Sequence, residues 1–222
     1  MTEGGNVRNQ YFINISSIQM LKFLVIFSLF VGSGSLFANP NLSEVPNGEY
    51  TLDKSHASIV WKVSHLGLSP YVARFTDFDM KFILDTHDMS KSRVTAIINA
   101  ASINTENKKF NQDLISNKWF KTKKFPKITF TSTSYQPNGV DKGKLIGIMQ
   151  MLGVEKTVEF DVNISGTVAD HPFIANSAGI GFTALAVIKR SDWNFRKLIP
   201  AVGDQVSIEI SAEFSKEKVD QN

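Results

Sequence analysis

The side chains that could carry chemistry in this chain are few and dispersed. The four histidines, at positions 56, 65, 87 and 171, are far apart, and no HxH or HExxH spacing occurs. A zinc or iron site needs three or four converging ligands. The chain also contains no cysteine, which excludes disulfides, cysteine-bound metal and a thiol nucleophile. We therefore predict no metal site and interpret the histidines as ordinary strand-end and loop residues.

Nucleophilic and nucleotide chemistry have equally little support. No GxSxG nucleophile elbow occurs, and Ser64 and His65 would point to opposite faces of a strand. Residues 179–184 match GxGxxA, but that motif binds a dinucleotide only between a strand and a following helix, and an alternating strand pattern follows here. We predict no catalytic residue, although the sequence does not exclude a triad assembled from distant positions.

Three polar residues share strand faces with apolar ones. The groups are Arg74 with Phe78 and Met80, Arg190 with Phe182 and Ile188, and His65 with Trp61 and Val63. A buried guanidinium without a partner is very costly. Each arginine should therefore pair with a carboxylate such as Asp192 or Asp204, emerge at the mouth of the fold, or contact a ligand head group. A β-bulge that turns Arg74 outward is a further alternative.

The elements that position these residues are strands, because apolar and polar residues alternate with a period of two. Eight strands are expected, near 51–65, 72–84, 93–101, 127–135, 144–152, 157–168, 181–190 and 206–214. One helix interrupts them after the third strand, from a cap at Thr105 to about Asn117. The simplest fold is an all-β, eight-stranded antiparallel barrel, which leaves no exposed edge. A two-sheet sandwich is the alternative.

The inward-facing residues of the strands bear on whether such a barrel is filled with side chains or hollow. Eight strands enclose just enough room for side chains or for one small ligand. Alanines occur in this phase at positions 96, 100, 184 and 186. They would either leave space or accommodate large aromatic neighbours, and the phase alone does not separate these readings. The expected wall residues are Ile59, Trp61, Val63, Phe78, Ile128, Phe130, Phe182 and Ala184.

Length and composition bound the remaining possibilities. The 222 residues are 42% hydrophobic with a net charge of +3, which fits one globular domain and gives no argument for nucleic acid. Residues 20–38 carry a short charged start, an apolar run and small residues, as a secretory signal does. We expect cleavage after Ala38, with an uncleaved anchor as the alternative. The expected organisation is an extension and signal (1–38), a linker (39–48), the barrel (49–216) and a polar tail (217–222).

A basic run follows the expected helix. Five lysines between positions 118 and 127 interleave with Trp119, Phe120 and Phe125. One interpretation is a solvated face whose aromatic residues cover the barrel. The other is docking to anionic lipid head groups, where each lysine contributes about 1 kcal/mol near the surface.

Eight short segments, in this order, resemble the YceI family of bacterial, mostly periplasmic, lipid-binding proteins. They are Tyr50–His56, Ile59–Gly67, Arg74–Phe78, Phe125–Ser132, Gly147–Val154, Gly181–Ala184, Arg190–Trp193 and Val202–Val206. The resemblance implies a lipocalin-like barrel that binds a polyisoprenoid, an isoprenoid quinone or a similar long-chain amphiphile without catalysis. The sequence departs from the family pattern at Asn194, where glycine is usual, and at Leu152, where a basic or polar residue is common.

We therefore predict a soluble periplasmic carrier with a long-chain lipid as its partner and no cofactor other than such a lipid. Transient contact with a membrane surface and a homodimer are also open. The alternatives are an isomerase or cyclase acting on a lipid in the lumen, and a small barrel embedded in the membrane. The predicted ligand-binding residues are Ile59, Trp61, Val63, His65, Arg74, Phe78, Ile128, Phe130, Phe182, Ala184 and Arg190.

Overall fold

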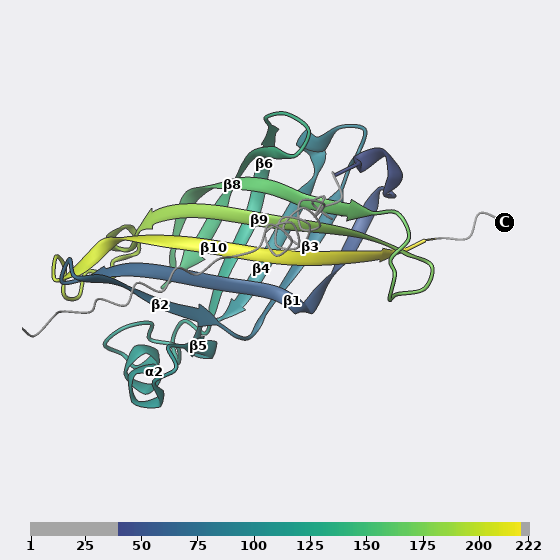
Figure 1. The fold of residues 1–222 in the computed structure, drawn as a ribbon. Helices are drawn as coiled ribbons and strands as arrows, with labels where there is room; N and C mark the ends of the chain where they lie inside the picture. The colour runs from purple at the N-terminus through teal and green to yellow at the C-terminus, as the bar shows by residue number, and fades with distance from the viewer. Residues whose placement is uncertain (1–39, 219–222) are drawn as a thin grey trace, which may run out of the picture. The chain divides into compact units, whose positions relative to one another are not determined.

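A computed structural model of the chain describes residues 40–218 (Figure 1). The expected signal segment and the cleavage site after Ala38 lie outside the described residues. Within the described part, no helix has both the length and the apolar character needed to cross a membrane.

The described residues form one antiparallel sheet of ten strand segments, in the order β10-β9-β8-β7-β6-β4-β3-β1-β2-β5. Pairing of β10 with β1 closes eight of them (β1, β3, β4 and β6 to β10) into a barrel, so the predicted fold class is confirmed. The segments are β1 (Gly48–His65), β2 (Ser69–Phe75), β3 (Phe78–Leu84), β4 (Arg93–Asn99), β5 (Ile103–Asn104), β6 (Lys127–Pro137), β7 (Lys142–Met151), β8 (Val154–Val168), β9 (Ser177–Lys189) and β10 (Val202–Glu217).

Strand β1 changes its neighbour along its length. Residues 48–51 pair with β3, whereas residues 59–65 pair with β2. The other edge of β1 pairs with β10 at both ends, with a register break between Asp53 and Ser58. Among residues 40–218, strand β2 pairs on its far edge only with the two-residue β5, through Arg74 and Phe75. Within this part of the chain, no further strand therefore pairs with the first residues of β2 on that edge.

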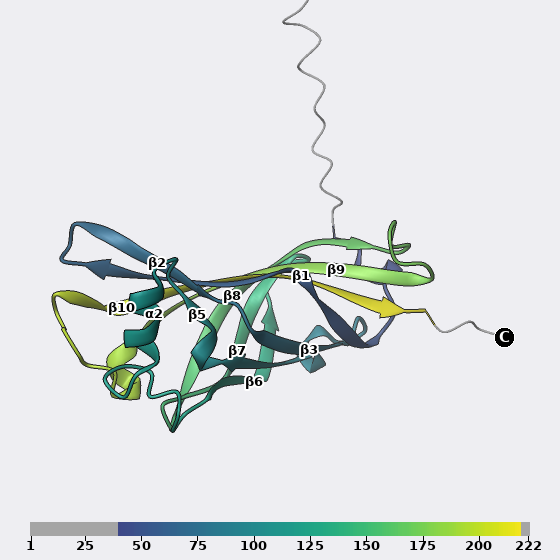
Figure 2. The same ribbon diagram turned by 90° about the horizontal axis from the view of Figure 1, so that it is seen from below.

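The segment between β5 and β6 lies against this side of the barrel and contains the helix α2 (Lys108–Ile115). Figures 1 and 2 show α2 beside β2 and β5. The helix begins later than predicted, because the side chain of Asn107 accepts the hydrogen bond from the backbone N–H of Phe110. Thr105 is not the cap, and its hydroxyl donates to the side chain of Asn111 instead.

Short 3-10 turns complete the fold. They are η1 (Leu42–Glu44), η2 (Met89–Lys91), η3 (Ala100–Ser102) and η4 (Arg190–Trp193).

The alternating strands bury their apolar phase inside the barrel. In β3, for example, the residues from Phe78 to Leu84 alternate strictly between buried and exposed. Part of the interior is filled by aromatic rings. Phe82 lies 4.9 Å from Phe182 and 5.6 Å from Phe214 between ring centroids, and Tyr50 packs on Phe82 as well. Edge-to-face and tilted contacts of this kind are favourable. The filled part of the interior contrasts with the remainder, which is hollow.

Candidate functional site: the barrel cavity

The barrel encloses a cavity of about 530 Å³. Side chains from all eight barrel strands line it, together with side chains from β2, α2, the segment that follows α2, the η2 region, η4 and the segment that follows η4. The lining is aliphatic and aromatic apart from a few polar residues, among them His65, Tyr71, Ser92, Tyr135 and Arg190. Ligand sites are typically apolar cavities of about 300–1,000 Å³ with few polar groups. The inward alanines could have indicated either a filled or a hollow barrel, and the structure shows a hollow one.

Small residues at inward positions explain the empty space. Ala96 and Ala184 both line the cavity and present only a methyl group to it. A glycine on β7 makes room for an aromatic side chain of the neighbouring strand β6, because a Cβ atom at Gly147 would lie 2.4 Å from the Phe130 ring. The absence of that atom allows Phe130 to lie against the strand β7. The sequence thus keeps large side chains close to the wall and the lumen open.

Most of the predicted ligand-binding residues lie on the cavity wall. Their places in the barrel are β1, β6 and β9, with one residue in η4. These residues are Ile59, Trp61, Val63, His65, Ile128, Phe130, Phe182, Ala184 and Arg190.

Two predicted residues do not line the cavity. Arg74 is exposed, whereas its neighbours Ala73 and Phe75 are buried, so its predicted inward position is wrong. The reason is that β2 and β3, predicted as one strand, are separated by Thr76 and Asp77, and the alternation restarts in β3. Phe78 is buried at the start of β3 but is not part of the cavity wall.

The predicted ligand-binding residues did not include a further group of lining residues, although Trp119 and Phe120 were expected on one interpretation to cover the barrel. They come from the start of β2, from α2 and from the loops that follow α2 and η4. No periodic pattern marks loop residues, so only their large aromatic side chains distinguished them. The clearest cases are Tyr71, Phe110, Trp119, Phe120 and Phe195.

Three segments converge at one end of the barrel, and we call them the mouth segments: residues 65–71, 105–126 and 189–204. Ring contacts connect them, with Tyr71 on Phe110 at 5.5 Å and Trp119 on Phe195 at 5.7 Å between centroids. The backbone N–H of Leu66 donates to the carbonyl of Ala201 at 2.7 Å. Figure 2 shows the β1–β2 hairpin, α2 and the start of β10 at this end.

The buried side chain of Arg190 holds the mouth segment 189–204 together through hydrogen bonds to its main chain. Its side chain is 5% exposed and donates four hydrogen bonds of 2.8–2.9 Å, to the carbonyl oxygens of Gly203, Phe195, Lys197 and Val202. Burial lowers the pKa of its guanidinium, although an arginine keeps its charge at neutral pH. Since four of its five N–H groups are engaged, Arg190 has little capacity left for a ligand head group.

The carboxylates that were expected to pair with Arg190 have other roles. Asp204 accepts hydrogen bonds from the hydroxyl and the backbone N–H of Ser191, at 2.7 and 2.9 Å. The hydroxyl bond is the main reason why the pKa of Asp204 is lowered. Asp192 is exposed and makes no ion pair among residues 40–218. The arginine therefore forms hydrogen bonds to the main chain in place of a salt bridge.

The remaining polar wall residues differ in how well they are satisfied. His65 ends β1 at the mouth and is exposed there. The indole N–H of Trp61 is buried and has no hydrogen-bond partner among the described residues. An unpaired buried donor typically costs about 1–3 kcal/mol. Both groups belong to β1, whose inward phase runs along the cavity.

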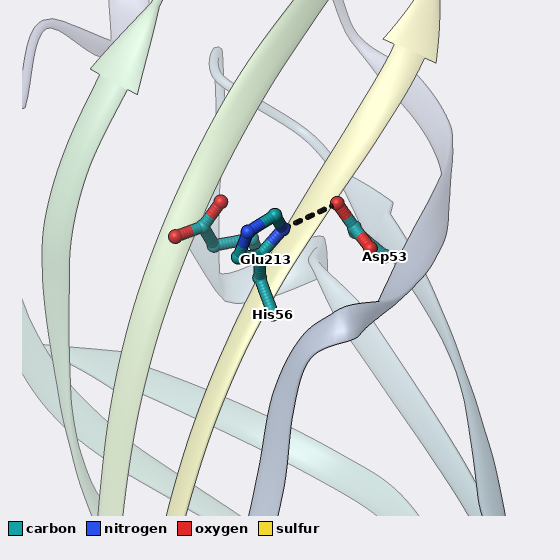
Figure 3. Close-up of side chains that lie close together, drawn as sticks. All are labelled: Asp53, His56 and Glu213. Carbon is teal, nitrogen blue, oxygen red and sulfur yellow. Dashed lines mark hydrogen bonds and ion pairs between the residues drawn. The ribbon is translucent and has the colours of Figure 1, made fainter.

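A separate polar cluster lies on the outside of the barrel, where β1 bulges against β10. Figure 3 shows Asp53, His56 and Glu213 close together, each with one possible ligand atom within 4.8 Å of the others. His56 Nδ1 bonds to Asp53 Oδ2 at 2.8 Å, and Asp53 Oδ1 accepts two hydrogen bonds from Ser55. The cluster is therefore an ion pair with a second carboxylate nearby, and it does not face the cavity.

The pKa values of this ion pair shift in opposite directions. Hydrogen bonds from Ser55 and His56 lower the pKa of Asp53, and the bond to Asp53 raises the pKa of His56. The contribution of Asp53 to stability is lost as the pH falls through its folded-state pKa, and that of His56 is lost as the pH rises through its folded-state pKa. The pair therefore stabilises the protein fully between about pH 4 and pH 6.5, the unfolded-state pKa values of the two groups.

Changing Asp53 to asparagine is expected to lower the pKa of His56 towards its ordinary value. The reason is that the hydrogen bond and the charge of Asp53 are the two largest causes of the upward shift. An NMR titration of the His56 ring in both proteins measures this change. The matched control is Asp161→Asn, which removes a carboxylate that pairs with Lys144 elsewhere. An unchanged His56 titration in Asp53→Asn would contradict the observed pairing.

Comparison with known proteins identifies the family to which this barrel is related. Residues 50–214 match the family model of the YceI-like domain. The protein YceI of Salmonella arizonae is 33% identical over 172 residues, which cover 77% of this chain and 88% of that protein.

Solved structures give the same result. A crystal structure of a YceI protein from Campylobacter jejuni matches with a TM-score of 0.63 and 30% identity, and the match covers 76% of this chain and 98% of that one. A polyisoprenoid-binding domain from Saccharophagus degradans, implicated in plant cell wall breakdown, matches with a TM-score of 0.54 over the same shares. At 13% identity, this second likeness shows the fold alone.

Proposed function

This chain belongs to the YceI-like family, and from that premise we propose that it is a periplasmic carrier that encloses one long-chain lipid in its barrel. The ligand class is an isoprenoid, an isoprenoid quinone or a fatty-acyl amphiphile. The periplasmic location rests on the signal-like pattern of residues 20–38. The polyisoprenoid-binding description of one structural neighbour supports the ligand class by analogy.

The observation that carries this proposal is the apolar cavity of about 530 Å³ inside the barrel. Each methylene group that leaves water contributes about 0.8 kcal/mol before the costs of ordering the chain. Ten methylene groups would thus contribute about 8 kcal/mol, which is of the order needed for micromolar affinity. Chain length therefore provides the affinity, while the few polar groups at the wall and mouth select the head group.

Binding is favoured over catalysis by the state of the polar groups. Arg190 is engaged by main-chain carbonyl oxygens, and Asp204 is held by Ser191. A general acid or base must lie within hydrogen-bond reach of the reacting group. His65, exposed at the mouth, is the wall residue best suited to proton transfer, so a catalytic role would be expected to depend on it.

The test begins with the lipid that the protein holds when it is purified from its own host. Organic extraction followed by mass spectrometry should recover one long-chain class at close to one molecule per protein. After removal of the lipid, returning the extract should change the fluorescence of Trp61 and Trp119, which line the cavity, but not that of the fully buried Trp193. Single Trp→Phe variants assign the signal.

Two outcomes would contradict the carrier proposal. The first is purified protein without any lipid that also fails to bind isoprenoid, quinone and fatty-acyl probes. The second is a recovered lipid that the protein alters chemically in a reaction lost in His65→Ala, which would make it an enzyme.

A further inference from the structure

We propose that the mouth segments form a docking surface for an anionic lipid bilayer, so that the cavity receives its ligand directly from the membrane. This inference rests on the proposed carrier function. It is carried by the exposed apolar side chains at the mouth, by the unpaired positive charge around them and by their position beside the cavity.

Exposed apolar side chains stand at the tips of two mouth segments. Leu66 and Leu68, in the turn between β1 and β2, are 56% and 83% exposed. Leu198 and Ile199, between η4 and β10, are 53% and 37% exposed. Single exposed apolar residues are normal on a protein surface, but groups of them mark interaction sites.

The two tips are held side by side. The backbone N–H of Leu66 donates to the carbonyl of Ala201, and His65 pairs with Val202 in the sheet. His65 and Val202 both line the cavity as well. The apolar tips are therefore next to the end of the barrel at which the cavity reaches exposed residues.

The mouth segments are strongly basic. They contain ten Lys and Arg residues and four Asp and Glu residues, whereas the rest of residues 40–218 contains 12 basic and 15 acidic residues. Apart from the buried Arg190, all of these basic side chains are exposed. They are Lys108, Lys109, Lys118, Lys121, Lys123, Lys124, Lys189, Arg196 and Lys197.

Within the described part of the chain, none of these nine side chains forms an ion pair with a carboxylate. Lys189 is close enough to Asp204 for its charge to help lower the pKa of that carboxyl, but the two do not form an ion pair. Lysines elsewhere commonly do, as in the pairs of Lys54 with Asp79 and of Lys62 with Glu209. A positive field of this kind is complementary to a negatively charged surface.

The opposite end of the barrel shows that exposed apolar residues alone do not define this surface. Phe173, in the loop between β8 and β9, is 91% exposed, and Val140, between β6 and β7, is 73% exposed. The charges there are different, because Lys218 pairs with Asp170 and Lys91 pairs with Asp88. Within residues 40–218, the mouth combines apolar tips with nine unpaired basic side chains, whereas Val140 at the opposite end has one unpaired lysine, Lys142, close to it in sequence.

This combination fits a bilayer surface. Lysine and arginine near an anionic leaflet each contribute about 1 kcal/mol, and this attraction weakens as salt screens it. Apolar side chains at loop tips can enter the boundary between head groups and acyl chains, as those of interfacial helices do. In this orientation the cavity faces the membrane, and a long tail can pass between bilayer and barrel without crossing water.

Vesicle flotation with the full-length protein tests the proposal. The vesicles are made of phosphatidylcholine alone or with 30% phosphatidylglycerol. We expect binding to the anionic vesicles that falls as salt is raised, and much weaker binding to the neutral ones. Two double variants at the mouth should each reduce binding at least tenfold. One removes apolar tips (Leu66→Ser with Leu68→Ser), and the other reverses charges (Lys118→Glu with Arg196→Glu). Two matched controls at the opposite end should bind like the wild type, namely the double variant Phe173→Ser with Val140→Ser and the single variant Lys142→Glu.

The bound lipid in each preparation separates this inference from the carrier function. Mouth variants that bind vesicles poorly but still hold lipid, with unchanged circular dichroism, support the docking surface. If the wild-type protein holds lipid but does not bind anionic vesicles, the docking proposal is overturned and the carrier proposal stands. Equal losses in the mouth and control variants would also overturn it, because the effect would then have no relation to the mouth.

Discussion

Replacing Ala184 by phenylalanine is expected to lower the affinity for a long-chain lipid about 100-fold. Ala184 lies on the cavity wall, between Val162 of β8 and Ile210 of β10. A phenyl ring there would occupy space that we assign to three or four methylene groups of the ligand. At about 0.8 kcal/mol for each group, the loss is about 3 kcal/mol, and each 1.4 kcal/mol is a factor of ten. Titration of the lipid-free protein with the recovered lipid measures the change.

The next residue on the same strand provides the control. Leu185 is 54% exposed on the outside of the barrel, so Leu185→Phe adds a ring of the same kind without entering the lumen. We expect its affinity to match that of the wild type. If Ala184→Phe binds the lipid as tightly as Leu185→Phe does, the ligand does not occupy the lumen beside β9, and the proposed function fails at its main premise.

Replacing Arg190 by methionine is expected to lower the free energy of unfolding by about 3–5 kcal/mol. Methionine keeps much of the side-chain volume but leaves four main-chain carbonyl oxygens without their donor. Each buried polar group that loses its partner costs about 1–3 kcal/mol, and water can reach some of these carbonyls at the mouth. Denaturation by guanidinium chloride measures the loss.

A neighbouring arginine distinguishes this structural role from ligand binding. Arg196 is exposed, so Arg196→Met should change stability by no more than about 0.5 kcal/mol. A structural Arg190 predicts a large loss of stability. If Arg190→Met is as stable as Arg196→Met but binds the lipid much more weakly, the guanidinium contacts the head group and the structural interpretation is wrong.

The strands and the barrel were predictable because they follow from local alternation. In β8 and β10, apolar and polar residues alternate over many positions. Such a period of two indicates a β-strand with one face buried and the other exposed. The position of Arg74 was not predictable in this way. Two residues between β2 and β3 switch the inward-facing residues from odd-numbered positions in β2 to even-numbered positions in β3. The alternation within each strand does not by itself reveal that switch. The cap of α2 was missed for a similar reason, since both Thr105 and Asn107 are residue types that favour caps.

The cavity was predictable only in part. Inward alanines such as Ala96 are compatible with a filled or a hollow barrel, because the outcome depends on which large side chains face them across the lumen. That is a property of strand tilt and register, which the sequence of one strand does not contain. The mouth was harder still, because its residues come together from three loops through contacts such as that between Trp119 and Phe195.

The change of neighbour along β1 makes the barrel wall unequal in strength. Around most of the circumference, adjacent strands are connected by ladders of main-chain hydrogen bonds, and separating them would break several bonds at once. Beside the first residues of β2 the wall is continued by the segment that contains α2, through ring contacts such as that of Tyr71 with Phe110. Side chains can slide and change rotamer without unzipping a sheet. We therefore expect a bulky ligand to gain room at this seam, where no ladder of main-chain hydrogen bonds has to break.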